Sequence, residues 1–460
     1  MEIDIKKYKH IYMSGIGGIS MSGIAEILKS WGYDVSGSDS NKSNQTDWLE
    51  SKGIRVNIGQ VAENITNIYD LFVYSAAIKS DNPEMVKAKE LGIPTIERGE
   101  FLGEITKLFK DTIGIAGTHG KTSTTSMVAG AFLEANLDPS IQVGAVLRIL
   151  DGNYRVGNSD YFIIEACEYC DSFLNFHQRS AIVLNIDNDH LDYFKNIDNI
   201  CKSFQKYVSL LPGDGYLVLN RDDEKCYELR NYTKAKVISV GSNDNADWYY
   251  KDVVFNEEGF ATYDAYKNGE NKGSISLKVA GLHNVFNSLC CIALCDAYDI
   301  DIDIVASSLL KFTGAARRLE FKGMINGAKI FDDYGHHPTE ITATINGIKN
   351  KKYNESWVVF EAHTYSRLAG HLNEFADSLK DFDHIVITDI YAARETNTYN
   401  IHEEDLINEL KKYNKEAIHI SDYDEIVKYL KNNVKENDIV LTLGAGNVTK
   451  IASKLVEDSN

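Results

Sequence analysis

The stretch from Gly114 to Ser123 reads Gly-Ile-Ala-Gly-Thr-His-Gly-Lys-Thr-Ser and combines glycines with a Lys-Thr pair between an apolar run and a helix-like segment. In such a loop, backbone N–H groups and a helix N-terminus face a polyphosphate, the Lys ammonium reaches the terminal phosphates, and the Thr hydroxyl faces Mg²⁺. The strict P-loop spacing requires glycine where this chain has Ile115, so the match is to a shorter Gly-Thr-x-Gly-Lys-Thr variant. We therefore predict an ATP-binding loop; a glycine-rich turn without a ligand is the alternative.

Acidic and imidazole side chains follow two further apolar runs. Glu165 ends the run 161–164, and the run 181–186 leads into Asp187-Asn-Asp-His190. Open α/β sheets bind ligands at the carboxyl ends of their strands. Glu165 can share a Mg²⁺ ion with Thr122, and His190 can hold a second ion or donate to a phosphate oxygen. Taken singly, each is equally typical of a solvated or structurally satisfied residue.

A glycine-rich turn near the N-terminus reads Gly15-Ile-Gly17-Gly18-Ile-Ser20, which is G-x-G-x-x-G with serine in the third glycine position. Asp39 follows Gly18 at the distance of a ribose-binding acid. By itself this pattern favours NAD. The same geometry would hold any nucleoside diphosphate at the helix N-terminus, and an unliganded turn is the third possibility.

Three more polar segments occur in the second half of the chain. The amides of Asn284 and Asn287 can contact an adenine edge, and an arginine such as Arg318 can stabilise a transferring phosphate. Helix capping and a surface salt bridge are the respective alternatives. The segment 332–340, Asp-Asp-Tyr-Gly-His-His-Pro-Thr-Glu, suits ribose binding, amine orientation or proton transfer near neutral pH.

The elements that must position these residues alternate between strand and helix patterns, which predicts parallel βαβ units. The first block has strands at 10–13, 33–36 and 71–74 and helices at 19–30 and 83–91, and the second has strands at 112–116, 161–164 and 181–186. The third block has strands at 329–331, 357–360, 384–388, 417–420 and 439–443. Three α/β domains are expected.

Composition limits the class of protein. A chain of 460 residues suggests about three domains, and a net charge of −19 argues against a non-specific nucleic-acid binder. We see no apolar run long enough for a membrane helix and expect a cytoplasmic protein. The seven cysteines, three of them in the helical pattern 290–295, do not indicate a disulfide framework.

Taken together, the motifs resemble those of the Mur ligases of peptidoglycan synthesis, over the whole chain. The segments that carry the resemblance are 15–18, 117–122, 165–169, 185–190, 283–287, Arg317-Arg318 and 332–338. The last segment is most similar to that of family members that add L-alanine to UDP-N-acetylmuramate or that recycle a preformed peptide.

The resemblance implies an α/β fold with three domains: a Rossmann-like domain for the UDP sugar (1–109), a central P-loop ATPase-type domain (110–314) and a C-terminal Rossmann-like domain for the amino acid (315–460). It implies ATP and Mg²⁺ as cofactors, and UDP-N-acetylmuramate and L-alanine as small-molecule substrates. ATP would phosphorylate the lactyl carboxylate, and the amine would then displace phosphate. No nucleic acid or membrane partner is expected, and the chain would be a monomer or homodimer.

By position, the resemblance implies site residues of several kinds. ATP binding would involve Gly117, Thr118, His119, Gly120, Lys121, Thr122, Ser123, Asn284, Asn287, Arg318 and Asp333. Metal binding would involve Thr122, Glu165 and His190, and catalysis Lys121, His190 and Arg318. The UDP sugar would contact Gly15, Gly17, Gly18, Ser20 and Asp39, and the amino-acid side would comprise His336, His337, His363 and Arg367.

Some positions depart from the family pattern. Glu361-Ala362 stands where Gln-Pro is common, and Asn447 stands where Asp is commoner. Lys206 lies near the place of the carbamylated lysine of several Mur ligases, but we predict no such ligand. The alternatives are a recycling ligase, a nicotinamide-dependent oxidoreductase, which leaves the phosphate loop unexplained, and a non-catalytic nucleotide-binding regulator.

Overall fold

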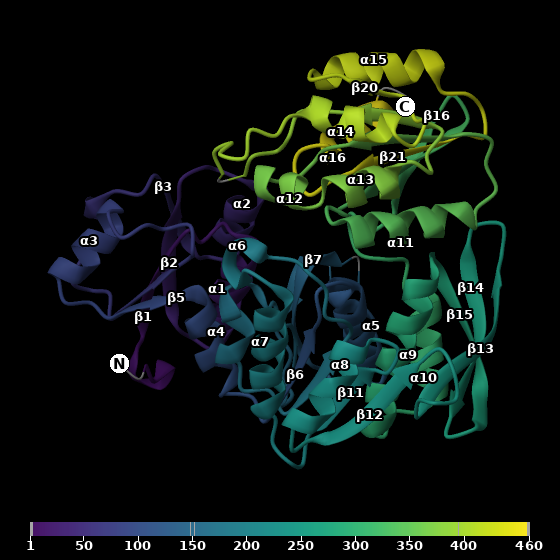
Figure 1. Cartoon of the computed structure of the whole chain (residues 1–460). Coiled ribbons are helices and arrows are strands. Elements are labelled where there is room, and N and C mark those ends of the chain that lie inside the picture. The colour runs from purple at the N-terminus through teal and green to yellow at the C-terminus, as the bar shows by residue number, and fades with distance from the viewer. Residues whose placement is uncertain (1–2, 148, 151, 394, 458–460) are drawn as a thin grey trace. The chain divides into compact units, whose positions relative to one another are not determined.

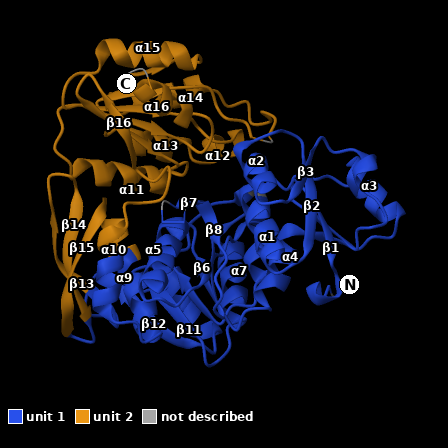
Figure 2. Cartoon of the chain, turned by 180° about the vertical axis from the view of Figure 1, so that it is seen from behind, with its two compact units in different colours: residues 1–249, 267–269, 288–308 blue, residues 250–266, 270–287, 309–460 orange. Residues whose placement is uncertain are grey.

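The computed structural model describes residues 3–147, 149–150, 152–393 and 395–457. The chain forms two compact units, shown in Figure 2. Unit 1 contains residues 1–249, 267–269 and 288–308, and unit 2 contains residues 250–266, 270–287 and 309–460. The chain as a whole contains three β-sheets with flanking helices, which confirms the predicted α/β fold class (Figure 1).

The N-terminal sheet of unit 1 is parallel and has the strand order β3-β2-β1-β4-β5. Its strands are β1 (His10–Ser14), β2 (Asp34–Asp39), β3 (Arg55–Ile58), β4 (Leu71–Tyr74) and β5 (Thr95–Glu97). Its helices are α1 (Ile19–Ser30), α2 (Asn44–Ser51), α3 (Pro83–Glu90) and α4 (Arg98–Thr106), with 3₁₀ turns η1 (Ile5–Lys7) and η2 (Ala62–Asn64). The order reverses between β1 and β4, which is the switch point at which such sheets bind ligands.

Alternation along β1 explains why this sheet is covered on both faces. Ile11 and Met13 pack into one apolar cluster with α1, whereas Tyr12 packs into another with Met85 of α3. Successive side chains of a strand point to opposite faces, so a run of apolar residues demands a helix on each side.

The central sheet has ten strands in the order β15-β14-β13-β12-β11-β10-β6-β9-β7-β8. Its strands are β6 (Asp111–Ala116), β7 (Ser140–Leu147), β8 (Gly152–Arg155), β9 (Tyr161–Glu165), β10 (Ser180–Val183), β11 (Tyr216–Asn220), β12 (Lys236–Gly241), β13 (Trp248–Phe255), β14 (Phe260–Lys267) and β15 (Glu270–Ala280). The helices of this region are α5 (Lys121–Glu134), α6 (Leu191–Phe194), α7 (Ile197–Ser209), α8 (Glu224–Glu228), α9 (Leu282–Ala297) and α10 (Ile302–Lys311), with η3 (Tyr169–Asn175) and η4 (Leu229–Tyr232).

Strand β6 lies between β9 and β10, and both neighbours run parallel to it. All six of its residues are buried, so it is a central strand with both faces covered. The expected strand 181–186 is shorter than predicted: β10 ends at Val183. Beyond this end the backbone N–H of Leu184 still donates to the carbonyl of Ala116 in β6, whereas the N–H of Ile186 donates to the carboxylate of Asp223, so the chain leaves the ladder after Leu184.

The C-terminal sheet lies in unit 2 and has the order β16-β17-β21-β18-β19-β20, with only β16 antiparallel to its neighbour among the described pairs. Its strands are β16 (Glu320–Ile325), β17 (Ala328–Asp333), β18 (Ser356–Phe360), β19 (His384–Ile387), β20 (Ala417–His419) and β21 (Ile439–Leu443). Its helices are α11 (Pro338–Lys349), α12 (Tyr365–Gly370), α13 (Leu372–Leu379), α14 (Glu403–Lys411), α15 (Tyr423–Asn433) and α16 (Thr449–Glu457).

This sheet also separates two apolar clusters. Val358 and Phe360 of β18 pack with Ile345 of α11 and Phe375 of α13, whereas Val359 packs in the cluster that holds α15 and α16. The connections after β17, β18 and β21 consequently emerge side by side at one edge, because Asp333 pairs with Leu443 and Phe360 pairs with the same residue.

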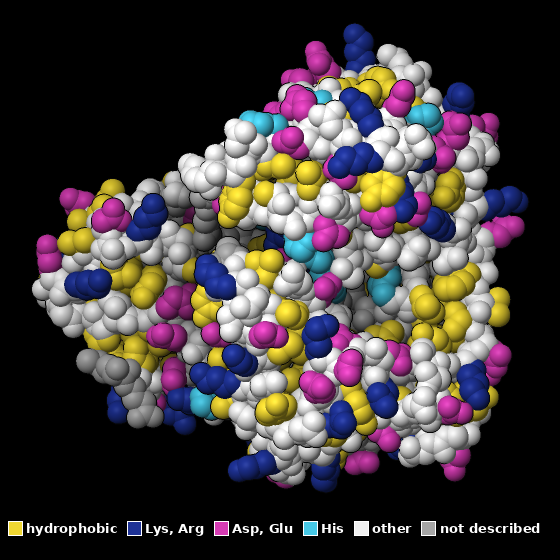
Figure 3. All heavy atoms as spheres, in the orientation of Figure 1, with side chains coloured by type: hydrophobic (Ala, Val, Ile, Leu, Met, Phe, Trp, Pro, Cys, Tyr) yellow, Lys and Arg dark blue, Asp and Glu magenta, His cyan; other side chains and the backbone are white. Residues whose placement is uncertain are grey.

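The surface, the helix lengths and the cysteines add three observations. Figure 3 shows acidic and basic side chains interspersed over the face that it draws. Within the described ranges, none of the helices is both long and apolar enough to cross a membrane. The cysteines predicted to lie in a helix, Cys290, Cys291 and Cys295, are buried in α9 and unpaired by disulfides.

Candidate active site

Two glycines shape the loop between β6 and α5. Gly117 has φ +133° and Gly120 has φ +84°, values that favour glycine. A Cβ atom on Gly117 would lie 3.0 Å from Cβ of Leu184, just beyond β10. Gly120 is the N-cap residue of α5. The first backbone N–H groups of that helix have no acceptor within the helix, so they can donate to an anion bound at its N-terminus.

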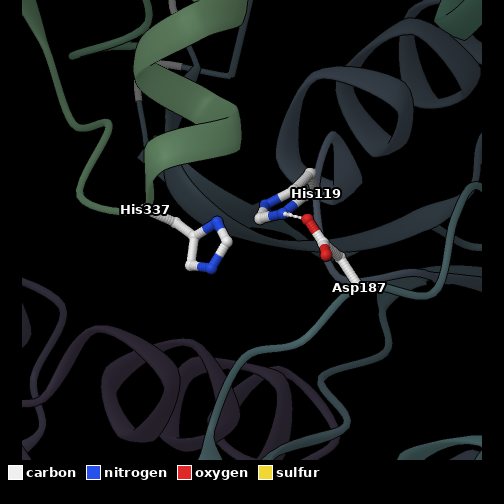
Figure 4. A group of neighbouring side chains, drawn as sticks. All are labelled: His119, Asp187 and His337. Carbon is white, nitrogen blue, oxygen red and sulfur yellow. Dashed lines mark hydrogen bonds and ion pairs between the residues drawn. The ribbon is translucent and has the colours of Figure 1, made fainter. Parts of the chain in front are cut away.

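The loop is fastened to the segment that follows β10. The backbone N–H of His119 donates to Oδ1 of Asn185 at 2.8 Å, and Nδ2 of Asn185 donates to the carbonyl of His119 at 3.0 Å. The backbone N–H of Asp187 donates to Oγ1 of Thr118 at 2.9 Å. The His119 ring also lies 3.0 Å from the Asp187 carboxylate, the contact dashed in Figure 4. These bonds fix the loop conformation from a neighbouring strand end.

Lys121, the first residue of α5, is held by oxygen atoms on several sides. Its Nζ donates to the carbonyls of Gly117 at 2.5 Å and Thr118 at 3.0 Å. It also lies 2.9 Å and 3.2 Å from the two carboxylate oxygens of Glu168, which is 2 % exposed. Burial alone lowers the pKa of a lysine, but the Glu168 carboxylate raises the pKa of Lys121 above its ordinary value. The ammonium is therefore charged at neutral pH.

Thr122 and Glu165 meet beside this lysine. Oγ1 of Thr122 lies 3.0 Å and 3.1 Å from the carboxylate oxygens of Glu165, and the backbone N–H of Gly144 donates to Glu165 at 2.8 Å. A hydroxyl and an oriented carboxylate at one point are hard oxygen donors of the kind that Mg²⁺ prefers. The pair thus fits the magnesium ligand set expected from the sequence.

His190 lies on the other side of Glu168. Its backbone is left-handed, with φ +54°, at the N-cap of α6. Its Nε2 is 3.8 Å from Glu168 and 3.8 Å from Asp189, and its ring lies against Tyr169. Unit 1 therefore gathers Lys121, Thr122, Glu165 and His190 at the carboxyl ends of β6, β9 and β10.

The N-terminal turn has the geometry of a dinucleotide-type loop. Gly15 has φ +81°, and the backbone N–H of Gly17 donates to Oδ2 of Asp39 at 3.0 Å. Gly18 is the N-cap of α1, and Oγ of Ser20 accepts from Gln142 at 2.7 Å. Asp39 thus already binds the loop backbone, and Ser20 bonds to the central region of the same unit.

In unit 2, Asp332 and Asp333 end β17 and face different partners. Asp332 is fully buried and accepts from the hydroxyls of Thr442 at 2.6 Å and Thr449 at 2.7 Å. Asp333 accepts the backbone N–H groups of Leu319 and Gly335, each at 2.7 Å. Burial raises the pKa of Asp333 to about 6, against the opposite effects of the Arg318 charge and of those two bonds. Asp332 thus bonds to side chains of β21 and α16, whereas Asp333 bonds to backbone N–H groups and has a raised pKa.

The two arginines lie near one aromatic ring. The guanidinium carbons of Arg317 and Arg318 lie 4.9 Å and 5.3 Å from the ring centre of Tyr334. Arg317 donates to the carbonyl of Gly444 at 2.5 Å, whereas Arg318 lies 3.7 Å from the carboxylate of Glu340. Cation–π contacts and the carboxylate limit the conformations of Arg318.

The histidines expected on the amino-acid side divide into two groups. His336 lies 5.6 Å from the ring of His363, and His363 Nδ1 is 3.2 Å from Nη1 of Arg367. His337, the N-cap of α11, instead lies 4.9 Å from the ring of His371. The structure brings His336, His363 and Arg367 together and gives His337 separate neighbours.

The two asparagines of α9 are 9 % and 5 % exposed, and they bond to each other: Nδ2 of Asn287 donates to Oδ1 of Asn284 at 3.3 Å. Asn284 also donates to the carbonyl of Ala280 at 2.8 Å. Burial lowers the pKa of the adjacent His283 to about 4, and the charge of Arg318 adds to the effect.

Sequence reasoning did not single out Glu168, Asn185 or Asp187, although all three lie inside the motifs noted. The available signal for Glu168 was its position three residues after Glu165, in Glu-Ala-Cys-Glu. Nothing in the sequence alone says that this carboxylate reaches the loop lysine, because the contact depends on the turn of η3 after β9.

Another group of ligand-type atoms occurs in unit 2. Asp389, Glu403 and His419 each offer one such atom within 4.8 Å of the others. His419 pairs with Asp389 at 2.8 Å, and Glu403 accepts the backbone N–H of Ile390 at 2.8 Å. A histidine–carboxylate hydrogen bond and a backbone hydrogen bond account for this group.

Comparison with known sequences covers nearly the whole chain. The sequence model described as "Mur ligase family, catalytic domain" matches residues 10–110, "Mur ligase middle domain" matches 115–295, and "Mur ligase, glutamate ligase domain" matches 317–446. The UDP-N-acetylmuramate–L-alanine ligase of Acetivibrio thermocellus is 46% identical over 457 residues, 99% of this chain and 97% of that protein. That of Caldanaerobacter subterraneus is 44% identical over 459 residues, covering 100% of both.

Solved structures of ligases are also similar to this chain over nearly its whole length. The UDP-N-acetylmuramate-alanine ligase of Thermotoga maritima superposes with a TM-score of 0.83 at 28% identity, covering 98% of this chain and 99% of that one. A murein peptide ligase of Psychrobacter arcticus superposes with a TM-score of 0.72 at 26% identity, covering 98% of each chain.

Proposed function

Because the chain belongs to the Mur ligase family, we propose that it joins L-alanine to the lactyl carboxylate of UDP-N-acetylmuramate with conversion of ATP to ADP and phosphate. This reaction is a step of peptidoglycan synthesis. We propose that the protein acts on these small-molecule substrates in the cytoplasm. Relatives of that name match at 44–46% identity over essentially the full chain, which supports this activity over others in the family.

The observation that carries the proposal is the grouping of Lys121, Thr122 and Glu165 at the end of β6 and β9. A carboxylate is a poor acceptor for an amine because its oxygen is a poor leaving group. Phosphorylating it requires a cation at the β- and γ-phosphates and a counter-charge for the transferring group. Lys121 supplies the first, and we assign the second to Arg318.

Magnesium fits the oxygen donors Thr122 and Glu165, and His190 is the candidate ligand of a second ion; when bound, these ions would neutralise charge on the phosphates. The chain's own groups do the rest. The N–H groups at the start of α5 hold phosphate oxygens, Asn284 and Asn287 contact adenine, and Asp333 accepts from the ribose. Further loop contacts to ATP are assigned to Gly117, Thr118, His119, Gly120 and Ser123.

The second half of the reaction is the attack of an amine on the acyl phosphate. Arg367 has the planar, two-pronged donor that binds a carboxylate, and its contact with His363 fixes the ring beside it. His336, which neighbours His363, and His337 are the candidate bases for the amine. We assign these four side chains to the amino-acid side.

The UDP sugar is assigned to the N-terminal turn, where Gly15, Gly17, Gly18 and Ser20 open α1 and Asp39 ends β2. A diphosphate at a helix N-terminus is the general solution for such a turn. We accordingly propose three functional regions: 1–109 for the sugar, 110–314 for ATP, and 315–460 for the amino acid.

The test is phosphate release with ATP, Mg²⁺ and UDP-N-acetylmuramate, comparing L-alanine, glycine, L-serine and the tripeptide that a recycling ligase would use. The proposal expects the highest kcat/KM with L-alanine and release that requires both substrates. Preference for the tripeptide would assign the chain to peptide recycling, and phosphate release independent of the sugar would refute the ligase reaction. NADH binding, measured alongside by fluorescence, is expected to be absent.

A further inference from the structure

The ammonium of Lys121 already has as many partners as it can serve. A lysine side chain has three N–H donors. Here Nζ lies within hydrogen-bond distance of four oxygens: the carbonyls of Gly117 and Thr118, and both oxygens of the Glu168 carboxylate. To grip a phosphate oxygen, Lys121 must therefore give up one of these contacts.

The carbonyls are the less exchangeable partners. The carbonyl of Gly117 belongs to a backbone fixed by a φ of +133° and by close approach to Leu184. Thr118 is bonded through its own N–H to Asn185 and through Oγ1 to the N–H of Asp187. Moving either carbonyl would require the whole loop to shift and these hydrogen bonds to break.

Glu168 is different, because its contact is made by a rotatable side chain. It lies in the turn after β9, immediately before η3. Its carboxylate is 2 % exposed and also lies 3.8 Å from Nε2 of His190, so the imidazole offers this carboxylate a second partner within the same unit. The Glu168 carboxylate therefore lies beside the lysine ammonium, where a phosphate oxygen would have to bind.

We propose that Glu168 is a positioning residue whose carboxylate holds Lys121 in place and is exchanged for a phosphate oxygen when the nucleotide binds. The idea rests on the proposed function in taking a nucleotide phosphate as the competitor. Glu168 keeps the ammonium pointed into the loop and sets a threshold that a ligand must exceed. A ligand that offers no phosphate at this point gains nothing from the exchange.

The exchange has opposite consequences for stability and for affinity. Removing one partner of a buried ion pair leaves an uncompensated charge, which is strongly destabilising. In Glu168→Gln the unpaired ammonium of Lys121 should lower the melting temperature. A phosphate would supply the negative charge that the variant lacks. ADP should therefore bind to Glu168→Gln about tenfold more tightly than to the unaltered protein.

The experiment measures ADP binding by calorimetry in EDTA, so that no divalent ion contributes, and melting temperature with and without saturating ADP. Glu168→Gln is compared with Glu84→Gln, a matched loss of a fully buried carboxylate that accepts from Tyr12 and Ser14 in the N-terminal sheet. We expect tighter ADP binding and a melting deficit that ADP removes for Glu168→Gln. For Glu84→Gln we expect unchanged binding and a deficit that ADP leaves in place.

Unchanged or weaker ADP binding by Glu168→Gln, with a deficit insensitive to ADP, would overturn the exchange and make Glu168 a purely structural partner. If Glu168→Gln does not fold, Glu168→Asp is measured in the same way: its shorter carboxylate reaches Lys121 less closely, so ADP should bind more tightly than to the unaltered protein, and unchanged or weaker binding would refute the exchange. Failure of the unaltered protein to bind ADP at all would instead count against the proposed function.

Discussion

Asp333 should make ATP use and folding stability respond to acid in opposite directions. Its carboxylate is 5 % exposed, and its pKa is raised to about 6. If the ionised form accepts from the ribose, protonation removes that acceptor, and kcat/KM for ATP should fall roughly tenfold between pH 7 and pH 5 through this group. Asp333→Asn should lower kcat/KM at pH 7 by about 10- to 100-fold, the worth of a charge-assisted hydrogen bond.

The stability effect has the other sign. The folded-state pKa lies above the unfolded value of 3.8, so the fold favours the protonated form. This contribution is greatest below about pH 4 and is lost as pH rises through 6. Relative to Asp333→Asn, the unaltered protein should gain about 1.3 kcal/mol in unfolding free energy between pH 7 and pH 5.

The assay is phosphate release at varied ATP with the other substrates saturating, from pH 5 to 8, together with urea unfolding at pH 5 and 7. The quantity compared is the ratio of unaltered protein to Asp333→Asn. The neighbouring Asp332→Asn is the control, since its carboxylate bonds to Thr442 and Thr449; it should lose stability but keep the acid limb. A ratio that does not change with pH would refute the titration of Asp333 as the cause.

Three further variants test other parts of the structure. Lys121→Ala should reduce phosphate release dependent on both substrates by about 1,000-fold or more while circular dichroism shows a folded protein; undiminished turnover would contradict the mechanism. Gly446→Ala should lower the unfolding free energy by about 1–3 kcal/mol in urea, because its Cβ would lie 2.1 Å from Oε1 of Glu361, whereas Gly370→Ala, with nothing within 4 Å, should not. Thr364→Gly should raise the melting temperature, since φ +70° and ψ +144° strain a β-branched residue by about 1–3 kcal/mol; a lower value would show that the strain is absent.

Local patterns predicted strands in all three sheets but did not predict β3, β5, β7, β8 or β11 to β16. Strands at 10–13, 71–74, 357–360 and 439–443 were placed within one residue at each end, because runs of apolar residues bounded by turns leave few alternatives. The strand expected at 181–186 was too long, since the apolar residues Leu184 and Ile186 continue the pattern after the chain has left the sheet. Hydrophobicity marks burial, and both residues are buried although neither belongs to a strand.

The sequence predicted which residues belong to the candidate site. It did not predict which side chains those residues contact. That Lys121, Thr122 and Glu165 belong to one chemistry follows from their motifs, and the structure brings the last two to 3.0 Å. The roles assigned to them stay proposals. The pairing of Lys121 with Glu168 and the division between Asp332 and Asp333 were beyond reach, because they depend on side-chain directions at two strand ends.

The sequence by itself determined the fold class, the family and the inventory of reactive groups, because periodicity and short motifs are local and survive without knowledge of long-range contacts. Only the tertiary structure decided which carboxylate holds the loop lysine, which aspartate is buried with a raised pKa, and which histidines are neighbours. These properties arise from desolvation and from distances of a few ångströms between segments far apart in the chain, where electrostatic interactions are strong.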